Sequence, residues 1–285
     1  MRPVLTILAL FLMVGCSTIP IQEQSVFMPK ASVTPESFDV EGVTLNNEYI
    51  QVDDSVALNA WYLTQPESEG TVLFFGGNGF YLVQSLGYIR ALTRPPLDAF
   101  RYDYRGYGQS VGSHGVDVLK RVALALYDSL PAREDIDPER LIVHGHSLGA
   151  FLATYVAEQR TVGGLVLENP ATNVDEWVQN LAPWYVRLFV SFEVDPALRD
   201  ESNLRRLQNL DDVPLLVVGG ASDQVTAPVM ARTLHEETTT APKELVIVED
   251  GGHNKLYTRA SYQAAYDRLV KRVTNRGAEL GARTD

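Results

Sequence analysis

Short apolar runs alternate with amphipathic stretches along most of the chain. Residues 49–52 and 56–64 flank three polar residues, a pattern that predicts an antiparallel hairpin. Six later runs are rich in leucine, β-branched and aromatic residues, and several are continuously apolar, which is typical of strands covered on both faces. These runs are residues 71–75, 99–102, 141–144, 165–167, 215–218 and 244–248.

Helical periodicity occupies the gaps between these runs. It is found at residues 83–92, 116–130, 148–159, 228–237 and 257–273. Strands that alternate with helices form a mainly parallel sheet with helices on both faces. The pattern therefore predicts an α/β fold whose sheet has roughly eight strands, the hairpin included.

One long insertion interrupts this alternation at residues 173–207. Aromatic and leucine side chains recur there at helical steps, and Pro183 divides the stretch into two short predicted helices. The stripe either packs as an extra helix pair or forms the inner face of a cap over an apolar substrate. In the second case Trp177, Trp184 and Phe189 would contact the substrate.

The N-terminus has the pattern of a targeting sequence. Arg2 precedes an apolar run that is too short for a stable membrane anchor, which predicts a secretory signal peptide over residues 1–15. Residues 12–17 read LMVGCS and resemble the bacterial lipoprotein box. The resemblance implies lipidation of Cys16. Because Ser17 follows the cysteine, the resemblance also implies a bacterial cell-envelope location, on the outer membrane facing the periplasm.

The remaining chain divides into three parts. Residues 16–37 are aperiodic and contain several prolines, which predicts a tether, and residues 275–285 predict a flexible tail. Residues 38–274 form one predicted domain that carries the insertion, and its length is ordinary for a single α/β unit.

Composition and charge then narrow the class of protein. The 24 Lys and Arg residues against 36 Asp and Glu residues give a net charge of −12 at pH 7. This disfavours nucleic-acid binding, which depends on clustered Lys and Arg. The single cysteine excludes an internal disulfide and a metal centre built on cysteines. We expect no metal and no organic cofactor.

A candidate nucleophile lies between a predicted strand and a predicted helix, where residues 145–149 read GHSLG. In this context G-x-S-x-G is a nucleophile elbow, a sharp turn that exposes the serine hydroxyl. The glycines are needed because side chains there would collide with neighbouring backbone. The helix that follows directs its amide dipoles toward a developing anion. We therefore predict that Ser147 is a nucleophile.

A serine nucleophile needs a general base and a carboxylate that orients the base. Of the five histidines, His253 lies in a glycine-containing loop just after a predicted strand. Asp223 also follows a strand end, and sites of parallel sheets assemble at the carboxyl ends of the strands. Asp250 is the rival acid, that is, the alternative candidate for the carboxylate of the triad, although a structural role in a turn better explains its position. The chain order Ser147, Asp223, His253 is that of α/β-hydrolases.

From residue 49 to the last predicted helix, the chain resembles the α/β-hydrolase superfamily, in particular its small serine hydrolases. The shared motifs are the elbow, GASD ending at Asp223, and DYRGYGQS at residues 103–110. We interpret the last of these as a structural turn near the site. The resemblance implies the α/β-hydrolase fold with a short helical cap.

The resemblance also implies an oxyanion hole. The family has an H-G-N-x-G loop, where this chain reads GGNG at residues 76–79, with glycine in place of the histidine. Two donors would stabilise the tetrahedral anion of acyl transfer. They would be the backbone N–H groups of Leu148 and of Asn78, with Gly77 as the alternative to Asn78.

These residues together predict a serine hydrolase for a small-molecule acyl substrate. Ser147 would attack an acyl carbonyl, His253 would take up and return the proton, and Asp223 would hold the imidazole. Carboxylic esters are the substrates that the resemblance favours, with thioesters or peptide bonds as alternatives on the same triad. A lipid-anchored binding protein that uses the fold without catalysis is the alternative from another class. In either case the lipid would attach the protein to a membrane.

Overall fold

The computed structural model describes residues 17–30, 38, 40–53, 56–94, 96–130, 133, 136–183 and 185–281. Eight strands form its central sheet: β2 (Thr44–Asp53), β3 (Val56–Thr64), β4 (Gly70–Phe75), β5 (Leu97–Tyr102), β6 (Leu141–His146), β7 (Gly164–Glu168), β9 (Leu215–Gly220) and β10 (Lys243–Val248). Their spatial order is β10-β9-β7-β6-β4-β5-β3-β2. Strand β3 runs antiparallel to both neighbours, and the other adjacent pairs are parallel. The sheet confirms the predicted fold class.

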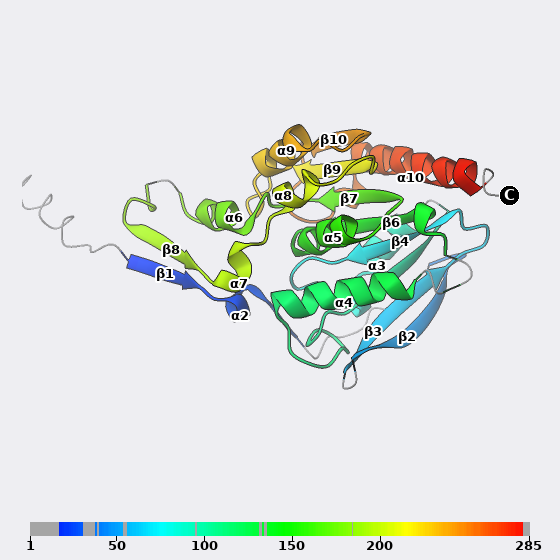
Figure 1. Ribbon diagram of the computed structural model, residues 1–285, viewed down its shortest axis with the longest axis horizontal. Coiled ribbons are helices and arrows are strands. Elements are labelled where there is room, and N and C mark those ends of the chain that lie inside the picture. Colours follow the sequence, from blue (N-terminus) through cyan, green and yellow to red (C-terminus); the bar gives the residue numbers. More distant parts are fainter. Residues whose placement is uncertain are drawn as a thin grey trace, which may run out of the picture.

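Helices cover both faces of this sheet (Figure 1). One face carries α4 (Val116–Ser129), α5 (Leu148–Gln159) and α9 (Pro228–Glu237), and the other carries α3 (Leu86–Leu92) and α10 (Ala260–Gly281). Short 3-10 helices are η1 (Leu82–Gln84), η2 (Pro138–Arg140) and η3 (Leu256–Thr258). No helix within the described ranges has the length and hydrophobicity that a membrane crossing requires.

Strand β4 shows why the central runs are continuously apolar. Leu73 and Phe75 belong to the core cluster under α4 and α5, whereas Val72 and Phe74 belong to the cluster under α3 and α10. Successive side chains of a strand point to opposite faces, so a strand with a core on each side needs apolar residues at every position. The same alternation occurs in β7 and β9.

Helix α10 is longer than the periodicity of its sequence predicts. It continues to Gly281, so the first part of the expected flexible tail is helical, and residues 282–285 lie outside the described ranges. The extension contains no proline and includes good helix formers such as Ala278 and Leu280. Periodicity did not reveal it because residues 275–281 have no regular apolar repeat in the sequence.

The insertion forms a cap that differs from the predicted helix pair. It contains α6 (Val174–Asn180), the strand β8 (Val190–Val194), and two short helices, α7 (Pro196–Arg199) and α8 (Asn203–Leu207). The first predicted helix is present and ends before Pro183. The expected second helix is replaced by the strand β8, whose backbone pairs with an N-terminal strand, β1 (Ser17–Ile21).

The N-terminal stretch expected to be a tether instead packs on the fold where it is described. We call residues 17–30 the N-terminal strap. Its strand β1 (Ser17–Ile21) pairs in parallel with β8, away from the central sheet (Figure 1). A single helical turn, α2 (Glu23–Val26), follows, and Phe27 is only 5% exposed. A strand whose partner lies 173 residues further along gives no local periodic signal.

Candidate active site

Ser147 lies at a sharp turn between β6 and α5. Its φ of 52° and ψ of −114° are rare for a residue with a side chain. The backbone N–H of Ser147 donates to the carbonyl of Glu168 on β7 at 2.9 Å, which ties the turn to the neighbouring strand. The strand, turn and helix have the arrangement expected of a nucleophile elbow.

The flanking glycines are required because backbone packs on backbone. A Cβ at Gly149 would overlap the carbonyl of Phe75 on β4, and one at Gly145 would lie 2.6 Å from the Cα of Ala150. Gly76, where the resembled family has histidine, is also crowded, because a Cβ there would overlap the ring of Phe80. The aromatic residue therefore occupies space that a larger side chain at this position would need.

The structure brings the three predicted catalytic residues together. Nε2 of His253 lies 2.9 Å from Oγ of Ser147, and Nδ1 of the same ring lies 2.8 Å from Oδ2 of Asp223. All three follow the carboxyl ends of parallel strands, namely β6, β9 and β10. The rival acid, Asp250, does not join them, because it forms a surface ion pair with Arg259 at 2.9 Å and its side chain is 70% exposed.

The carboxylate of Asp223 is held in its ionised form. Burial raises its pKa, but the hydrogen bond and charge of His253 and two backbone amides outweigh burial and hold the pKa below its ordinary value. Oδ1 accepts from the N–H groups of Val225 and Thr226 at 2.7 and 3.0 Å, and Oδ2 accepts from the Thr226 hydroxyl at 2.8 Å. The carboxylate can therefore stabilise a protonated imidazole.

Asn169, which sequence reasoning missed, connects the loops that carry the acid and the base. Its Nδ2 donates to the carbonyls of Gly252 and His253 at 3.1 and 2.8 Å, and its Oδ1 accepts from the N–H of Gly220 at 2.9 Å. Nε2 of His146 lies 3.0 Å from the same carbonyl of His253. The only sequence signal for Asn169 is a polar residue directly after a buried strand.

A buried carboxylate and a buried imidazole lie close together beneath the elbow. Oε2 of Glu168 is 3.4 Å from Nε2 of His144, and neither side chain is exposed. The hydroxyls of Tyr88 and Tyr262 donate to the same carboxylate at 3.1 and 3.3 Å. Burial raises the pKa of Glu168, but His144, His146 and the hydrogen bond from Tyr88 outweigh burial, and the net shift of the pKa is downward. His144 is thus a packing residue of the strand.

The candidate oxyanion donors lie at the same pocket as the nucleophile. Leu148 is the first residue of α5, so its N–H is one of the groups that a helix leaves without an internal acceptor. Asn78, Gly77 and Leu148 all line the pocket that contains Ser147. A carbonyl oxygen bound there would lie near the positive end of α5.

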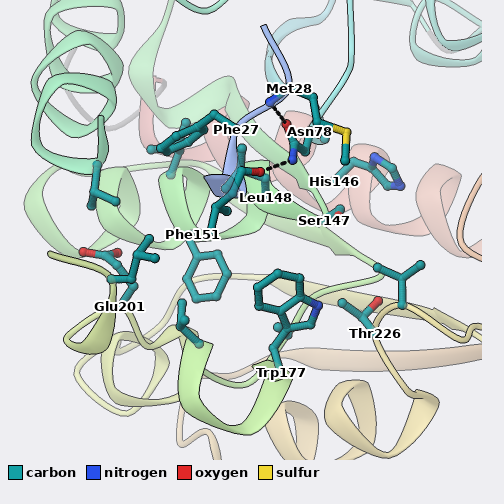
Figure 2. Close-up of a pocket in the computed structure, with 18 of the residues that line it drawn as sticks. Phe27, Met28, Asn78, His146, Ser147, Leu148, Phe151, Trp177, Glu201 and Thr226 are labelled. Atoms are coloured by element: carbon teal, nitrogen blue, oxygen red, sulfur yellow. Dashed lines mark hydrogen bonds between the residues drawn. The ribbon is translucent and has the colours of Figure 1, made fainter. Parts of the chain in front are cut away.

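The pocket beside Ser147 is largely apolar and has a volume of about 430 Å³. Its walls come from the strap, from α4 and α5, and from the cap (Figure 2). Among the predicted substrate contacts, Trp177 lines the pocket. Phe189 is 37% exposed and is not part of the described lining, because the helix that carries Trp177 ends before it. Trp184 lies outside the described residues.

Among the described residues that line the pocket, Glu201 carries the one carboxylate, and it is paired with two cations. Its Oε1 lies 3.0 Å from Nζ of Lys120, and its Oε2 lies 2.6 Å from a guanidinium nitrogen of Arg206. Among the described residues, no group of three His, Cys, Asp or Glu side chains is arranged to hold a metal ion.

Two family models match the chain. One, described as serine aminopeptidase, S33, matches residues 66–209, and the other, described as TAP-like protein, matches residues 188–275. The first covers half of the chain. The chain belongs to this family of α/β-hydrolases. The second match covers the end of the cap and the strands and helices after it.

This α/β-hydrolase has similar proteins in distant organisms. It is 28% identical over 235 residues to the uncharacterized protein Rv2307c of Mycobacterium tuberculosis, covering 82% of this chain and 80% of that protein. It is 26% identical over 247 residues to the α/β-hydrolase domain-containing protein WAV2 of Arabidopsis thaliana, covering 81% and 80%. The esterase Pf2001 of Pyrococcus furiosus has a similar fold, with a TM-score of 0.68, 16% identity, and coverage of 87% and 98%.

The crowding at the elbow makes a prediction about stability. We expect Gly149→Ala to lower the free energy of unfolding by roughly 1–3 kcal/mol, because the added methyl group displaces the Phe75 carbonyl. An alanine in an ordinary helix would instead stabilise by about 1 kcal/mol. Urea unfolding measures the difference. Gly252→Ala is the control, since a Cβ there meets nothing within 4 Å. Equal stability of the two variants would contradict the prediction.

Proposed function

We propose that this α/β-hydrolase is a serine hydrolase that cleaves carboxylic esters with an apolar acyl group. The observation that carries the proposal is the hydrogen-bonded series Ser147, His253, Asp223 beside an apolar pocket. A serine hydroxyl becomes a useful nucleophile when an oriented base accepts its proton. The pocket accounts for the acyl group, since apolar lining gains free energy by removing an apolar chain from water.

The proposed reaction has two stages. Oγ of Ser147 attacks the ester carbonyl while Nε2 of His253 takes the hydroxyl proton, and the resulting oxyanion lies near the N–H of Leu148. The imidazolium then gives its proton to the leaving alkoxide, and the acyl group remains on the serine. In the second stage the imidazole deprotonates water, which attacks the acyl-enzyme, and the acid product leaves as the serine regains its proton.

The lining of the pocket favours esters over peptides with a free amino terminus. Binding a terminal ammonium group in an apolar site needs an unpaired carboxylate. Glu201 is the carboxylate among the described lining residues, and Lys120 and Arg206 already neutralise it. The triad itself, by contrast, does not distinguish an alcohol from a thiol as the leaving group. Thioesters are therefore tested as substrates beside esters.

A fluorophosphonate probe and a substrate series test the proposal. We expect the probe to label the wild-type protein, and p-nitrophenyl esters to be hydrolysed faster than matched thioesters and aminoacyl anilides. Ser147→Ala should abolish both labelling and turnover. Full ester turnover by Ser147→Ala, or a folded wild type that the probe does not label, would overturn the proposal.

The acid gives a second, matched test. We expect Asp223→Asn to lower kcat by about ten-thousandfold, because the amide cannot hold the imidazole tautomer that accepts the serine proton. Asp250→Asn changes the rival acid in the same way and should keep kcat within about twofold, since its side chain is exposed. Steady-state kinetics on one ester compares the two. A large loss in Asp250→Asn alone would reverse the assignment of the acid.

We also propose that the mature protein is a lipoprotein of the bacterial outer membrane, attached through Cys16. The support is the sequence at residues 12–17, which lies mostly outside the described residues. Each acyl methylene buried in a bilayer contributes about 0.8 kcal/mol, so several acyl chains make a durable anchor. The strap would then begin at the membrane surface.

The anchor predicts how the protein fractionates. We expect wild-type protein to stay in the membrane fraction after a high-salt wash, and Cys16→Ala to be released, as followed by immunoblotting. Ser17→Asp keeps the cysteine and should move the protein from the outer to the inner membrane. Salt-resistant membrane binding of Cys16→Ala would show that the attachment does not depend on this lipid.

A further inference from the structure

The N-terminal strap is built into the cap and into helix α4. Strand β1 pairs with β8 from Ser17 opposite Val190 to Ile21 opposite Val194. The backbone N–H of Glu23 then donates to Oδ2 of Asp195 at 3.3 Å, just after β8. These bonds fix the strap along the cap.

The side chain of Glu23 caps a helix that lacks a capping residue of its own. Its Oε1 accepts from the N–H of Val116 at 2.6 Å, at the start of α4. The N-cap residue of this helix, Gly115, has no side chain to accept that bond. A carboxylate at a helix N-terminus satisfies a free N–H and faces the positive end of the helix dipole. The strap thus supplies the N-terminal cap of α4.

The side chain of Asn78 joins the strap to the candidate oxyanion loop. Its Nδ2 donates to the carbonyl of Val26, and its Oδ1 accepts from the N–H of Met28 at 2.9 Å (Figure 2). The same Oδ1 also accepts from the hydroxyl of Tyr107 at 2.9 Å. The carbonyl of Met28 accepts from the Tyr81 hydroxyl at 2.8 Å. The Asn78 side chain therefore ties the backbone of the strap to the loop in which the N–H of Asn78 is a candidate oxyanion donor.

Phe27 gives the strap an apolar face toward the substrate pocket. Its side chain is almost fully buried, and its ring packs edge-on against His114 at 5.1 Å between centroids. In the view of Figure 2, Phe27 lies above and Trp177 below, with Leu148 and Phe151 at heights between them. The strap therefore forms one wall of the pocket and the cap forms another.

We propose that the N-terminal strap is part of the substrate site, with Phe27 limiting the length of acyl chain that fits and Asn78 acting as a positioning residue for the oxyanion loop. This inference rests on the proposed function and adds the segment that sets acyl selectivity. Phe27 touches the bound acyl chain. The Asn78 side chain touches no substrate and acts through its own backbone N–H, which it holds in register with Ser147.

The selectivity of the strap is tested with p-nitrophenyl acetate, hexanoate and decanoate. We expect Phe27→Ala to raise the decanoate-to-hexanoate ratio of kcat/KM by roughly tenfold, since room for one more methylene in an apolar pocket is worth about that factor. Phe27→Leu, which disturbs the core less, should give a smaller shift in the same direction. Thr18→Ala, on the exposed part of the strap, is the control.

The positioning role is tested on the acetate, which does not reach the apolar walls. We expect Asn78→Ala to lower kcat by roughly tenfold to a hundredfold with KM nearly unchanged, because a misplaced donor weakens transition-state binding more than substrate binding. Asn78→Asp keeps both accepted bonds and should recover part of kcat. Asn209→Ala removes an exposed asparagine and should leave both constants unchanged.

Fluorophosphonate labelling separates the possible outcomes. If the wild type is labelled and turns over esters, but Phe27→Ala keeps the wild-type chain-length profile, the strap does not set selectivity. If Asn78→Ala keeps the wild-type kcat, or changes KM alone, the positioning role is overturned. If the folded wild type is neither labelled nor active, the proposed function fails and the role of the strap fails with it.

Discussion

The left-handed turn at Ser147 is the constraint on which the rest of the site depends. A residue with a side chain pays on the order of 1–3 kcal/mol for such a backbone, so surrounding contacts must hold it. Here β4 and β7, the neighbours of β6, do so. The carbonyl of Phe75 leaves no room for a side chain at Gly149, and the carbonyl of Glu168 binds the N–H of Ser147. Because these strands lie in the middle of the sheet, the nucleophile is fixed by the most buried part of the fold.

The base and the acid are held differently, because they lie on loops. Their loops are joined by side chains that bond to backbone groups. Asn169 binds the carbonyls of Gly252 and His253 and the N–H of Gly220, while Thr226 binds the carboxylate of the acid and the carbonyl of Asn169. On folding, each of these polar groups exchanges a hydrogen bond to water for one to protein, so each bond adds little net stability. A buried polar group left without a hydrogen-bond partner would, however, be costly. Their main effect is to leave the imidazole few alternative positions.

The sequence allowed most of the central fold to be predicted, because that part depends on local patterns. Strands with a core on each face are continuously apolar, and α5 and α9 begin and end at the residues that periodicity indicated. The positions of Ser147, Asp223 and His253 followed from the strand ends that precede them. The cap and the strap were not predictable in this way, because β1 and β8 are strands only through each other. Asn169 and Thr226 escaped notice because their role depends on backbone groups that the fold brings near.

The contacts of the strap differ in strength along its length. These differences determine which part of the strap can separate from the domain. A parallel pair as short as β1 and β8 is marginal by itself, and its residues are mostly exposed. By contrast, Phe27 belongs to the same buried cluster as α4 and the central strands, and Asn78 bonds the backbone on both sides of it. Because regions with little buried apolar area open at low cost, we expect local opening of the strap to begin at β1. Phe27, which forms part of the pocket wall, belongs to the more firmly held part of the strap.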